Sequence, residues 1–279
     1  QMVSGATQVL WGLFKKMLVA DNLAVVVDAI FANPGKFAPA QLFIAVIFFT
    51  IQIYCDFSGY SDIAIGTGRI LGIKLADNFN RPYHAVSITD FWNRWHISLS
   101  LWLRDYLFLP ISYRVSGKIK TPEVLGLRAD KWAYILGIIS TMLICGIWHG
   151  AAWTFIFWGG LHGVYMAIAF VTRKTRSKIR KKLGVKKSSG LHKIFGVTVT
   201  FTFVSVAWTF FKAKNLDDAF YIVSKLFTGF VDFFVNAFNF IVNVNSSELS
   251  KFLLSFKMRT LNIHLIVVVL GFLFVLGWE

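Results

Sequence analysis

Residues 132–171 read WAYILGIISTMLICGIWHGAAWTFIFWGGLHGVYMAIAFV, and this stretch decides the fold class. No Asp, Glu, Lys or Arg lies between Lys131 and Arg173. The two apolar runs in it, 132–148 and 151–171, are each close to the ~20 residues that an α-helix needs to cross a bilayer. His149 and Gly150 separate the runs. The pattern therefore predicts two membrane-spanning helices with a histidine at their junction.

The composition of the whole chain also indicates a membrane protein. Apolar residues make up 56% of 279 positions, and the mean hydropathy is +0.61. Charged residues are 15%, against roughly 25% in soluble domains. The net charge of +15 would suggest nucleic acid binding in a soluble chain, but the basic residues cluster between apolar runs. Such clustering sets orientation in a membrane, so no nucleic acid partner is expected.

We expect an all-α, polytopic membrane protein that forms a single domain over residues 1–279. Two stretches, 9–31 and 216–244, are amphipathic and predict tilted or interfacial helices. Residues 74–90 are polar, contain a proline and predict a loop. Besides the pair above, three apolar runs are expected to span the membrane: residues 40–54, 194–211 and 261–278.

The segment 173–193 is expected to be a basic loop on the cytoplasmic side. It holds ten Lys and Arg residues and no acidic residue. Loops rich in Lys and Arg stay in the cytoplasm, and residues 112–131 follow the same rule. A second interpretation of 173–193 is a patch that binds anionic lipid. Both interpretations place it on the cytoplasmic face.

The sequence gives no sign of cysteine chemistry or of a secretory signal peptide. Cys55 and Cys145 lie in apolar runs and have neither metal-ligand spacing nor the pattern of a disulfide framework, so no metal site is expected. No signal peptide pattern opens the chain. The chain begins in the middle of an apolar pattern, which suggests that it is incomplete at its N-terminus.

His149 is the sharpest candidate for chemistry. An ionisable residue at membrane depth marks a functional site by default. The glycine pairs 146/150 and 159/163 are spaced four apart, which lets helices approach closely. A packed histidine bonded to a backbone carbonyl and a general base in a buried slot remain equally open. Cys145 is a weaker nucleophile candidate, and His162 is expected to be structural.

The stretch TDFWNRWHISLSLWLRDYLFLP, residues 89–110, predicts a single helix. Its aromatic residues recur at spacings of three and four, and Thr89 or Asp90 can cap its start. Asp90 and Arg94 form an i,i+4 pair. Either the helix lies at the membrane interface, or its polar side forms the wall of a cavity for an anion. The polar residues in question are Arg94, His96, Arg104 and Asp105.

A dense polar cluster lies in IQIYCDFSGYSDIAIGTGRILGI, residues 51–73. Asp56 and Asp62 follow an apolar run, and such a cluster is costly near membrane depth unless it is satisfied internally. The Gly66-x-Gly68 element is no dinucleotide fingerprint, because the next glycine is one residue too far and no strand precedes it.

These blocks, together with GLFKKMLVAD (12–21) and GIWHGAAWTFIFWGGLHG (146–163), resemble the membrane-bound O-acyltransferase (MBOAT) family. The similarity is strongest to its bacterial alginate O-acetylation branch, and D-alanyl transfer proteins of teichoic acid synthesis are cousins. The pairing of RWHISLSxWLRDY with WHGAxW about fifty residues later is highly specific. Asn93 stands where many relatives have Arg, and residues 112–120 diverge.

The resemblance implies a helical bundle with a central tunnel and interfacial helices, in a bacterial inner membrane. It implies transfer of an acyl group, most simply acetyl, from a cytoplasmic thioester to a hydroxyl outside. The donor would be acetyl-CoA or an acyl carrier thioester, with no bound cofactor. The acceptor would be a polysaccharide or a secreted acyl-acceptor protein. His149 would then be catalytic, and His96 would be the second histidine of the site.

The remaining site candidates would line the tunnel or contact substrate. Trp148, Trp153 and nearby backbone N–H groups are candidates to steady an oxyanion. The substrate and tunnel candidates are Trp148, Trp153, Arg94, Arg104, Asp105 and Asp56. Two other functions stay open: a transporter or proton relay that uses His149 and Asp56, and a non-catalytic scaffold for polysaccharide modification. The sequence shows no internal repeat of the kind that transporters often carry.

Overall fold

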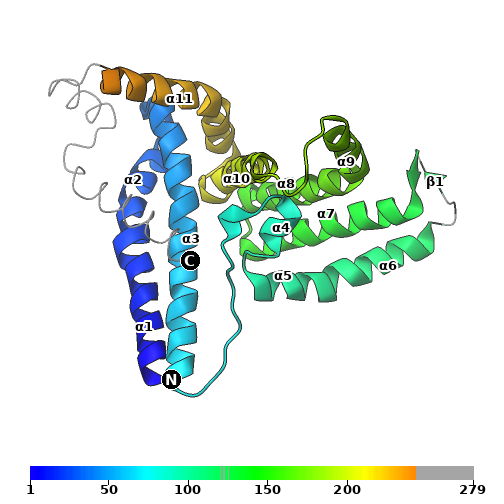
Figure 1. Cartoon of the computed structure of the whole chain (residues 1–279), viewed down its shortest axis with the longest axis horizontal. Coiled ribbons are helices and arrows are strands. Elements are labelled where there is room, and N and C mark those ends of the chain that lie inside the picture. The colour runs from blue at the N-terminus through cyan, green and yellow to red at the C-terminus, as the bar shows by residue number, and fades with distance from the viewer. Residues whose placement is uncertain (120, 122, 125, 243–279) are drawn as a thin grey trace. The chain divides into compact units, whose positions relative to one another are not determined.

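The computed structural model describes residues 1–119, 121, 123, 124 and 126–242, and these are almost entirely helical. Figure 1 shows the helices along the chain. Within the described residues four helices are long and apolar enough to cross a membrane. They confirm the spans expected near 40–54, 132–148, 151–171 and 194–211, whereas the expected span 261–278 lies outside the described residues. The chain divides into two compact units, residues 1–76 with 212–242 and residues 77–211.

The first unit is built on an antiparallel helix pair, visible as α1 and α3 in Figure 1. α1 (Met2–Leu13) continues through a π-helical segment (Phe14–Ala20) into α2 (Asp21–Ala32). A short 3₁₀ turn (Pro34–Lys36) then leads to α3 (Pro39–Ile70). At 32 residues, α3 is roughly 48 Å long, more than the ~30 Å of a bilayer core. α1, the π-helical segment and α2 together cover the amphipathic stretch 9–31, which is helical as predicted.

Glycines let α1 and α3 approach closely. A Cβ atom on Gly5 would lie 2.7 Å from the carbonyl oxygen of Gly66, and one on Gly12 would lie 2.5 Å from that of Gly59. Real Cβ atoms do not come so close, so larger residues at these positions would force the helices apart. α11 (Leu216–Val242) packs on α3 through Phe43, whose ring meets those of Phe230 and Phe233. The expected amphipathic helix 216–244 is confirmed over its described part.

The second unit contains α7 (Ala129–His149) and α8 (Trp153–Val171), which pack against each other. The sequence predicted a break at His149–Gly150; the structure places it at Gly150–Ala152, so that His149 belongs to α7. α4 (Ile88–Trp92), α5 (Ile97–Leu103), a π-helical segment (Arg104–Phe108) and α6 (Leu109–Lys118) come before them. A two-residue antiparallel pair, β1 (Glu123–Val124) and β2 (Leu127–Arg128), joins α6 to α7.

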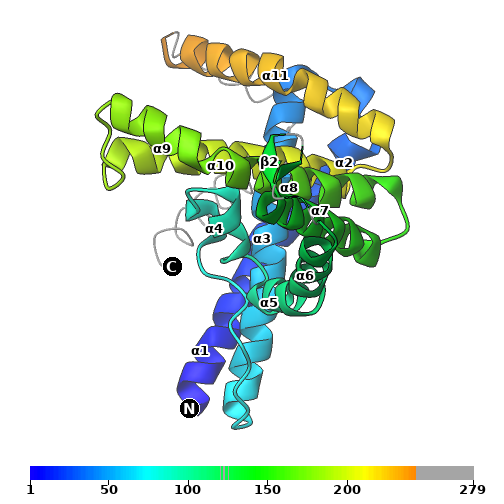
Figure 2. The ribbon, with the colours of Figure 1, turned by 90° about the vertical axis from the view of Figure 1, so that its right-hand side faces the viewer.

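The basic segment 173–193 is largely helical rather than an open loop. α9 (Arg173–Lys182) follows α8 after one residue, and α10 (Gly190–Lys212) begins before the segment ends. Figure 2 shows α9 beside the start of α10. Long basic side chains on consecutive turns do not prevent a helix, because Lys and Arg have good helix propensity. Its cytoplasmic location stays a prediction.

Candidate functional site

His149 is the last residue of α7, and its imidazole lies among aromatic rings. Gly150 follows in an extended conformation that ends the helix. The imidazole is half-buried, and its centroid lies 5.0 Å from the Trp158 ring and 5.1 Å from the Phe211 ring, both edge-to-face. Phe155 and Trp148 complete the surroundings at 6.4 Å and 4.8 Å. The sequence places a titratable group here in an environment of uncharged rings.

Close packing of α7 on α8 sets the position of Trp158 against His149. A Cβ on Gly163 would lie 2.9 Å from the Cα of Ile139, and Gly146 and Gly159 leave no room for a side chain between the helices. The predicted close approach at these glycines is confirmed. Because Trp158 and Gly159 are consecutive, the contact that fixes Gly159 also holds the indole in place beside the imidazole.

The expected single helix over residues 89–110 is wrong. α4 ends at Trp92, and α5 begins only at Ile97, after a break over residues 93–96 whose last residue is His96. His96 has φ of 42° in the left-handed region, which an L-residue adopts only when its surroundings enforce it. The expected cap is also wrong, because the Ser87 hydroxyl caps α4 by accepting from the Asp90 backbone N–H.

The break divides the expected aromatic stripe between two environments. Trp92 and Trp95 are buried, whereas Trp102 and Tyr106 on the later turns are exposed. Regular spacing in the sequence suggested one face, but the break over residues 93–96 separates the two halves. The indole N–H of Trp92 donates to Nδ1 of His162, at 3.2 Å, and His162 is fully buried. His162 thus has the structural place that the sequence suggested.

Hydrogen bonds from a neighbouring segment hold the break. The backbone N–H of Ile97 donates to the carbonyl of Asn78, at 3.0 Å, and that of Asn80 donates to the carbonyl of Arg94, also at 3.0 Å. The side-chain Oδ1 of Asn78 accepts from the Ser98 hydroxyl at 2.6 Å and from its backbone N–H at 3.3 Å. Asn78 and Asn80 were missed by sequence reasoning, although Asn is typical of such local backbone pairing.

The two family-motif histidines come together in this unit. His96 and His149 are near enough to interact electrostatically, although they lie 53 positions apart in the sequence. Burial lowers the pKa of His96 below 6.5, because the charged imidazolium is poorly solvated there. A neutral imidazole can accept a proton, so the lowered pKa keeps His96 in the form that can do so.

The other expected site residues occupy more varied positions. Trp148 and Trp153 flank the α7–α8 break and are 65% and 73% exposed. The guanidinium of Arg94 bonds to Asp90 at 2.8 Å, which confirms the expected pair, and to the carbonyl of Asn80. Arg104 and Asp105 pair with each other at 2.8 Å on an exposed surface. Arg104 also borders a cavity of about 250 Å³, with Trp92 and Tyr134 among its lining residues.

Asp56 and Asp62 belong to the first unit, and both are paired. Lys16 Nζ lies 2.6 Å from Asp56 and 2.8 Å from Asp21, and Lys15 Nζ lies 2.5 Å from Asp62. The two carboxylates of the cluster are thus satisfied internally, whereas the buried hydroxyls of Ser58 and Ser61 between them have no hydrogen-bond partner in the described residues. The lysine partners were missed, because they lie 40 and 47 positions before the aspartates in the sequence. The sequence did contain a sign of these pairs, because two consecutive lysines in an apolar stretch need acidic partners.

The chain is similar to known acyltransferases. The MBOAT (membrane-bound O-acyltransferase) family pattern matches residues 2–182. A probable alginate O-acetylase of Azotobacter vinelandii is 38% identical over 82% of this chain and 41% of its own length. A Helicobacter pylori peptidoglycan O-acetyltransferase is 39% identical, over 75% of this chain and 36% of its own.

A Bacillus subtilis teichoic acid D-alanyltransferase is 31% identical over 60% of this chain and 40% of its own length. The chain thus spans about two fifths of the length of these relatives. The family match covers both the lysine–aspartate helix pair and the two histidine motifs. With its four candidate spans, the chain is a multi-pass membrane protein. It belongs to the membrane-bound O-acyltransferase family.

Proposed function

We propose that the protein is an O-acyltransferase of a bacterial inner membrane, which acetylates a hydroxyl of a cell-envelope or exopolysaccharide. The observation that carries the proposal is the arrangement around His149. An imidazole at the end of a spanning helix is enclosed by rings and has a second imidazole close by. The names of the relatives support acetyl as the acyl group, since two of those described act in O-acetylation.

In the proposed reaction, His149 accepts the proton of the acceptor hydroxyl as its oxygen attacks the thioester carbonyl. The tetrahedral oxyanion then expels the donor thiolate, which takes the proton back from the imidazolium. His96 supports the site from the break between α4 and α5, where its position is held by the segment 78–80. The indoles of Trp148 and Trp153 lie beside the break at Gly150 and are candidates to meet the acceptor.

The donor is proposed to arrive from the cytoplasm. Coenzyme A and carrier-bound phosphopantetheine are anionic and cytoplasmic, and the basic segments 112–131 and 173–193 would raise their local concentration. Labelled acyl thioester, supplied to one side of oriented vesicles that hold the full-length protein, would test this. Transfer is expected only from the cytoplasmic side. Equal transfer from the outer side across an intact membrane would contradict the proposal.

The test of the reaction itself is His149→Ala in the full-length protein. Loss of a general base typically costs about 10²–10⁴ in rate, so acetylation of the envelope polymer should fall below detection. Mass analysis of the polymer measures the acetyl content, and immunoblotting measures accumulation of the variant. Near wild-type acetylation by His149→Ala would remove the residue from the mechanism.

A further inference from the structure

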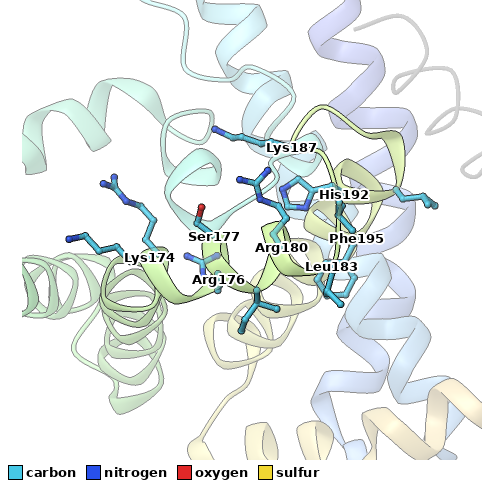
Figure 3. A pocket seen from close by; sticks show the side chains of 12 residues that line it. Lys174, Arg176, Ser177, Arg180, Leu183, Lys187, His192 and Phe195 are labelled. Atoms are coloured by element: carbon cyan, nitrogen blue, oxygen red, sulfur yellow. The ribbon is translucent and has the colours of Figure 1, made fainter.

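A groove of about 840 Å³ lies between α9 and the start of α10, within the second unit. Its lining is of two kinds. Five Lys or Arg side chains and five aliphatic or aromatic ones take part, together with Ser177 and His192. In Figure 3 the side chains of Arg180, Lys187 and His192 gather on one side, and those of Leu183 and Phe195 on the other. The groove therefore has a cationic side and an apolar side.

The cationic side carries charge that no acidic residue balances. No Asp or Glu occurs between Arg173 and Lys193. In the part of the chain that the structure describes, none of the Lys and Arg residues lining the groove forms an ion pair with a carboxylate. Arg176 is held internally, because its guanidinium donates to the Ala169 carbonyl and the Thr172 hydroxyl at the end of α8. Arg180 and Lys187 remain available for an anion.

The apolar side is exposed to an unusual degree for a surface so rich in charge. Leu183 is 70% and Phe195 is 68% exposed. A soluble anion such as inorganic phosphate would neutralise the cations but leave these side chains in contact with water. An occupant with both an anionic group and a hydrocarbon chain satisfies both sides, because burial of apolar surface adds to the electrostatic attraction.

The place of the groove in the chain favours a lipid. α8, a candidate span, ends at Val171, and α9 begins two residues later. α10, the next candidate span, supplies Leu191, His192 and Phe195 to the groove. A groove that joins the ends of two spans lies at the depth where lipid headgroups are found.

We propose that this groove binds one anionic phospholipid, with its phosphate at Arg180 and Lys187 and an acyl chain along Leu183 and Phe195. This goes beyond the proposed acyl transfer, since it assigns a lipid site outside the histidine region. A bound lipid neutralises part of the charge of 173–193, and the basic residues outside the groove, in 173–193 and in 112–131, remain to attract the donor.

The experiment measures lipid retention by the purified full-length protein. The protein is mixed with equal amounts of phosphatidylglycerol and phosphatidylcholine of matched chains, and native mass spectrometry counts the lipids retained. The test variant is Arg180→Gln with Lys187→Gln. The control is Lys181→Gln with Lys186→Gln, which removes the same charge from adjacent positions that do not line the groove.

Each basic residue near a membrane surface contributes about fivefold to the attraction of anionic lipid. For the two residues placed at the lipid phosphate, this contribution predicts at least tenfold lower retention of phosphatidylglycerol in the test variant. Lys181 and Lys186 do not line the groove, so retention of a lipid held there should stay within about threefold of wild type in the control. Phosphatidylcholine retention should not change in either. Equal loss in both variants would mean diffuse attraction by the whole segment, and no loss in either would mean that the groove is not the site. Both results would overturn the proposal.

A second arm distinguishes a lipid from a soluble anion. Leu183→Ser with Phe195→Ser keeps every charge and removes the apolar side. Retention of phosphatidylglycerol should fall at least fivefold. Glycerol phosphate and coenzyme A, added in excess, should not displace the lipid from the wild-type protein. Displacement by coenzyme A, or unchanged retention in this variant, would assign the groove to a soluble anion and overturn the lipid.

Discussion

The α1–α3 pair and the α7–α8 pair use glycine in the same way but treat polar groups in opposite ways. Both pairs bring backbones together where a Cβ would not fit. Between α3 and the π-helical segment after α1, each buried charge meets an opposite charge, as Lys15 meets Asp62. Around α7 and α8 the polar groups are imidazoles among aromatic rings: His149 packs edge-to-face on Trp158, and His162 accepts a hydrogen bond from the indole of Trp92.

This difference separates polar groups that stabilise the fold from those available for chemistry. A paired buried charge has no capacity left for a substrate, and its removal leaves the partner uncompensated. A neutral imidazole among rings costs less to bury than a charge and keeps a nitrogen that can accept a proton. The comparison therefore predicts that substitutions in the two regions fail differently, by misfolding in one and by loss of rate in the other.

The largest difference in acetylation is expected between two amide substitutions, His149→Gln and Asp56→Asn. His149→Gln should lower acetylation by about 10²–10⁴ while the protein accumulates normally, because a proton acceptor is lost. Asp56→Asn should keep activity within about threefold, because its ion pair is half exposed and exposed pairs contribute little. Acetylation of the polymer and protein level are measured together. A comparable loss of acetylation in a well-folded Asp56→Asn protein would favour a proton relay and break the comparison.

The next effect concerns the buried pair. Lys15 is 2% exposed and lies 2.5 Å from Asp62, so Lys15→Met leaves a carboxylate without its counter-charge. Breaking a buried pair typically costs about 3–5 kcal/mol, and the partial exposure of Asp62 argues for the lower end. Thermal unfolding in detergent should show a clear loss of stability. Adding Asp62→Leu should restore most of it, because the uncompensated charge is gone. A double variant as unstable as the single would show that the lysine matters for reasons other than charge.

The sequence predicted the spanning helices well because long uninterrupted apolar runs have one low-energy arrangement in a bilayer. It also predicted the close approach of α7 and α8, because the spacing of glycines can be read from one short stretch of sequence. It failed at residues 93–96, where a regular aromatic spacing continued through a break. Backbone hydrogen bonds from Asn78 and Asn80 hold the chain on either side of the left-handed His96. The local spacing of aromatic residues contains no information about these bonds. The ion pairs of Lys15 with Asp62 and of Lys16 with Asp56 were not predicted either, because the partners lie far apart in the sequence.

Two substitutions at His96 distinguish the contribution of its imidazole from that of its left-handed backbone. His96→Ala changes both, because Ala tolerates a φ of 42° less well than Asn does. His96→Asn keeps a residue suited to the left-handed region and removes the imidazole. If the imidazole supports the reaction, both variants should lose at least tenfold in acetylation, and the Asn variant should accumulate better. Full activity in His96→Asn would assign only a backbone role to this position.

A pH dependence follows from the same residue. Burial lowers the pKa of His96, so the unfolded chain binds a proton there at a higher pH than the folded chain does. Stability from this site is thus lost as the pH falls below about 6.5 towards the lowered value. Thermal unfolding of His96→Asn should depend less on pH over that interval than unfolding of the wild type. An unchanged dependence would mean that other groups govern the acid sensitivity.

The smallest effect is expected at Asn78, which holds the chain beside His96. Its Oδ1 accepts from Ser98, and its carbonyl accepts from Ile97, the residue after His96. Asn78→Ala keeps the backbone bond and loses the side-chain ones, so acetylation should fall only a few-fold, in line with about 0.5–1.5 kcal/mol for a hydrogen bond. Asn78→Asp keeps an acceptor and should restore most of the activity. Because Asn78 acts through His96, Asn78→Ala should add little to the loss already caused by His96→Asn. Additive losses would show that Asn78 stabilises the unit generally and does not position the histidine.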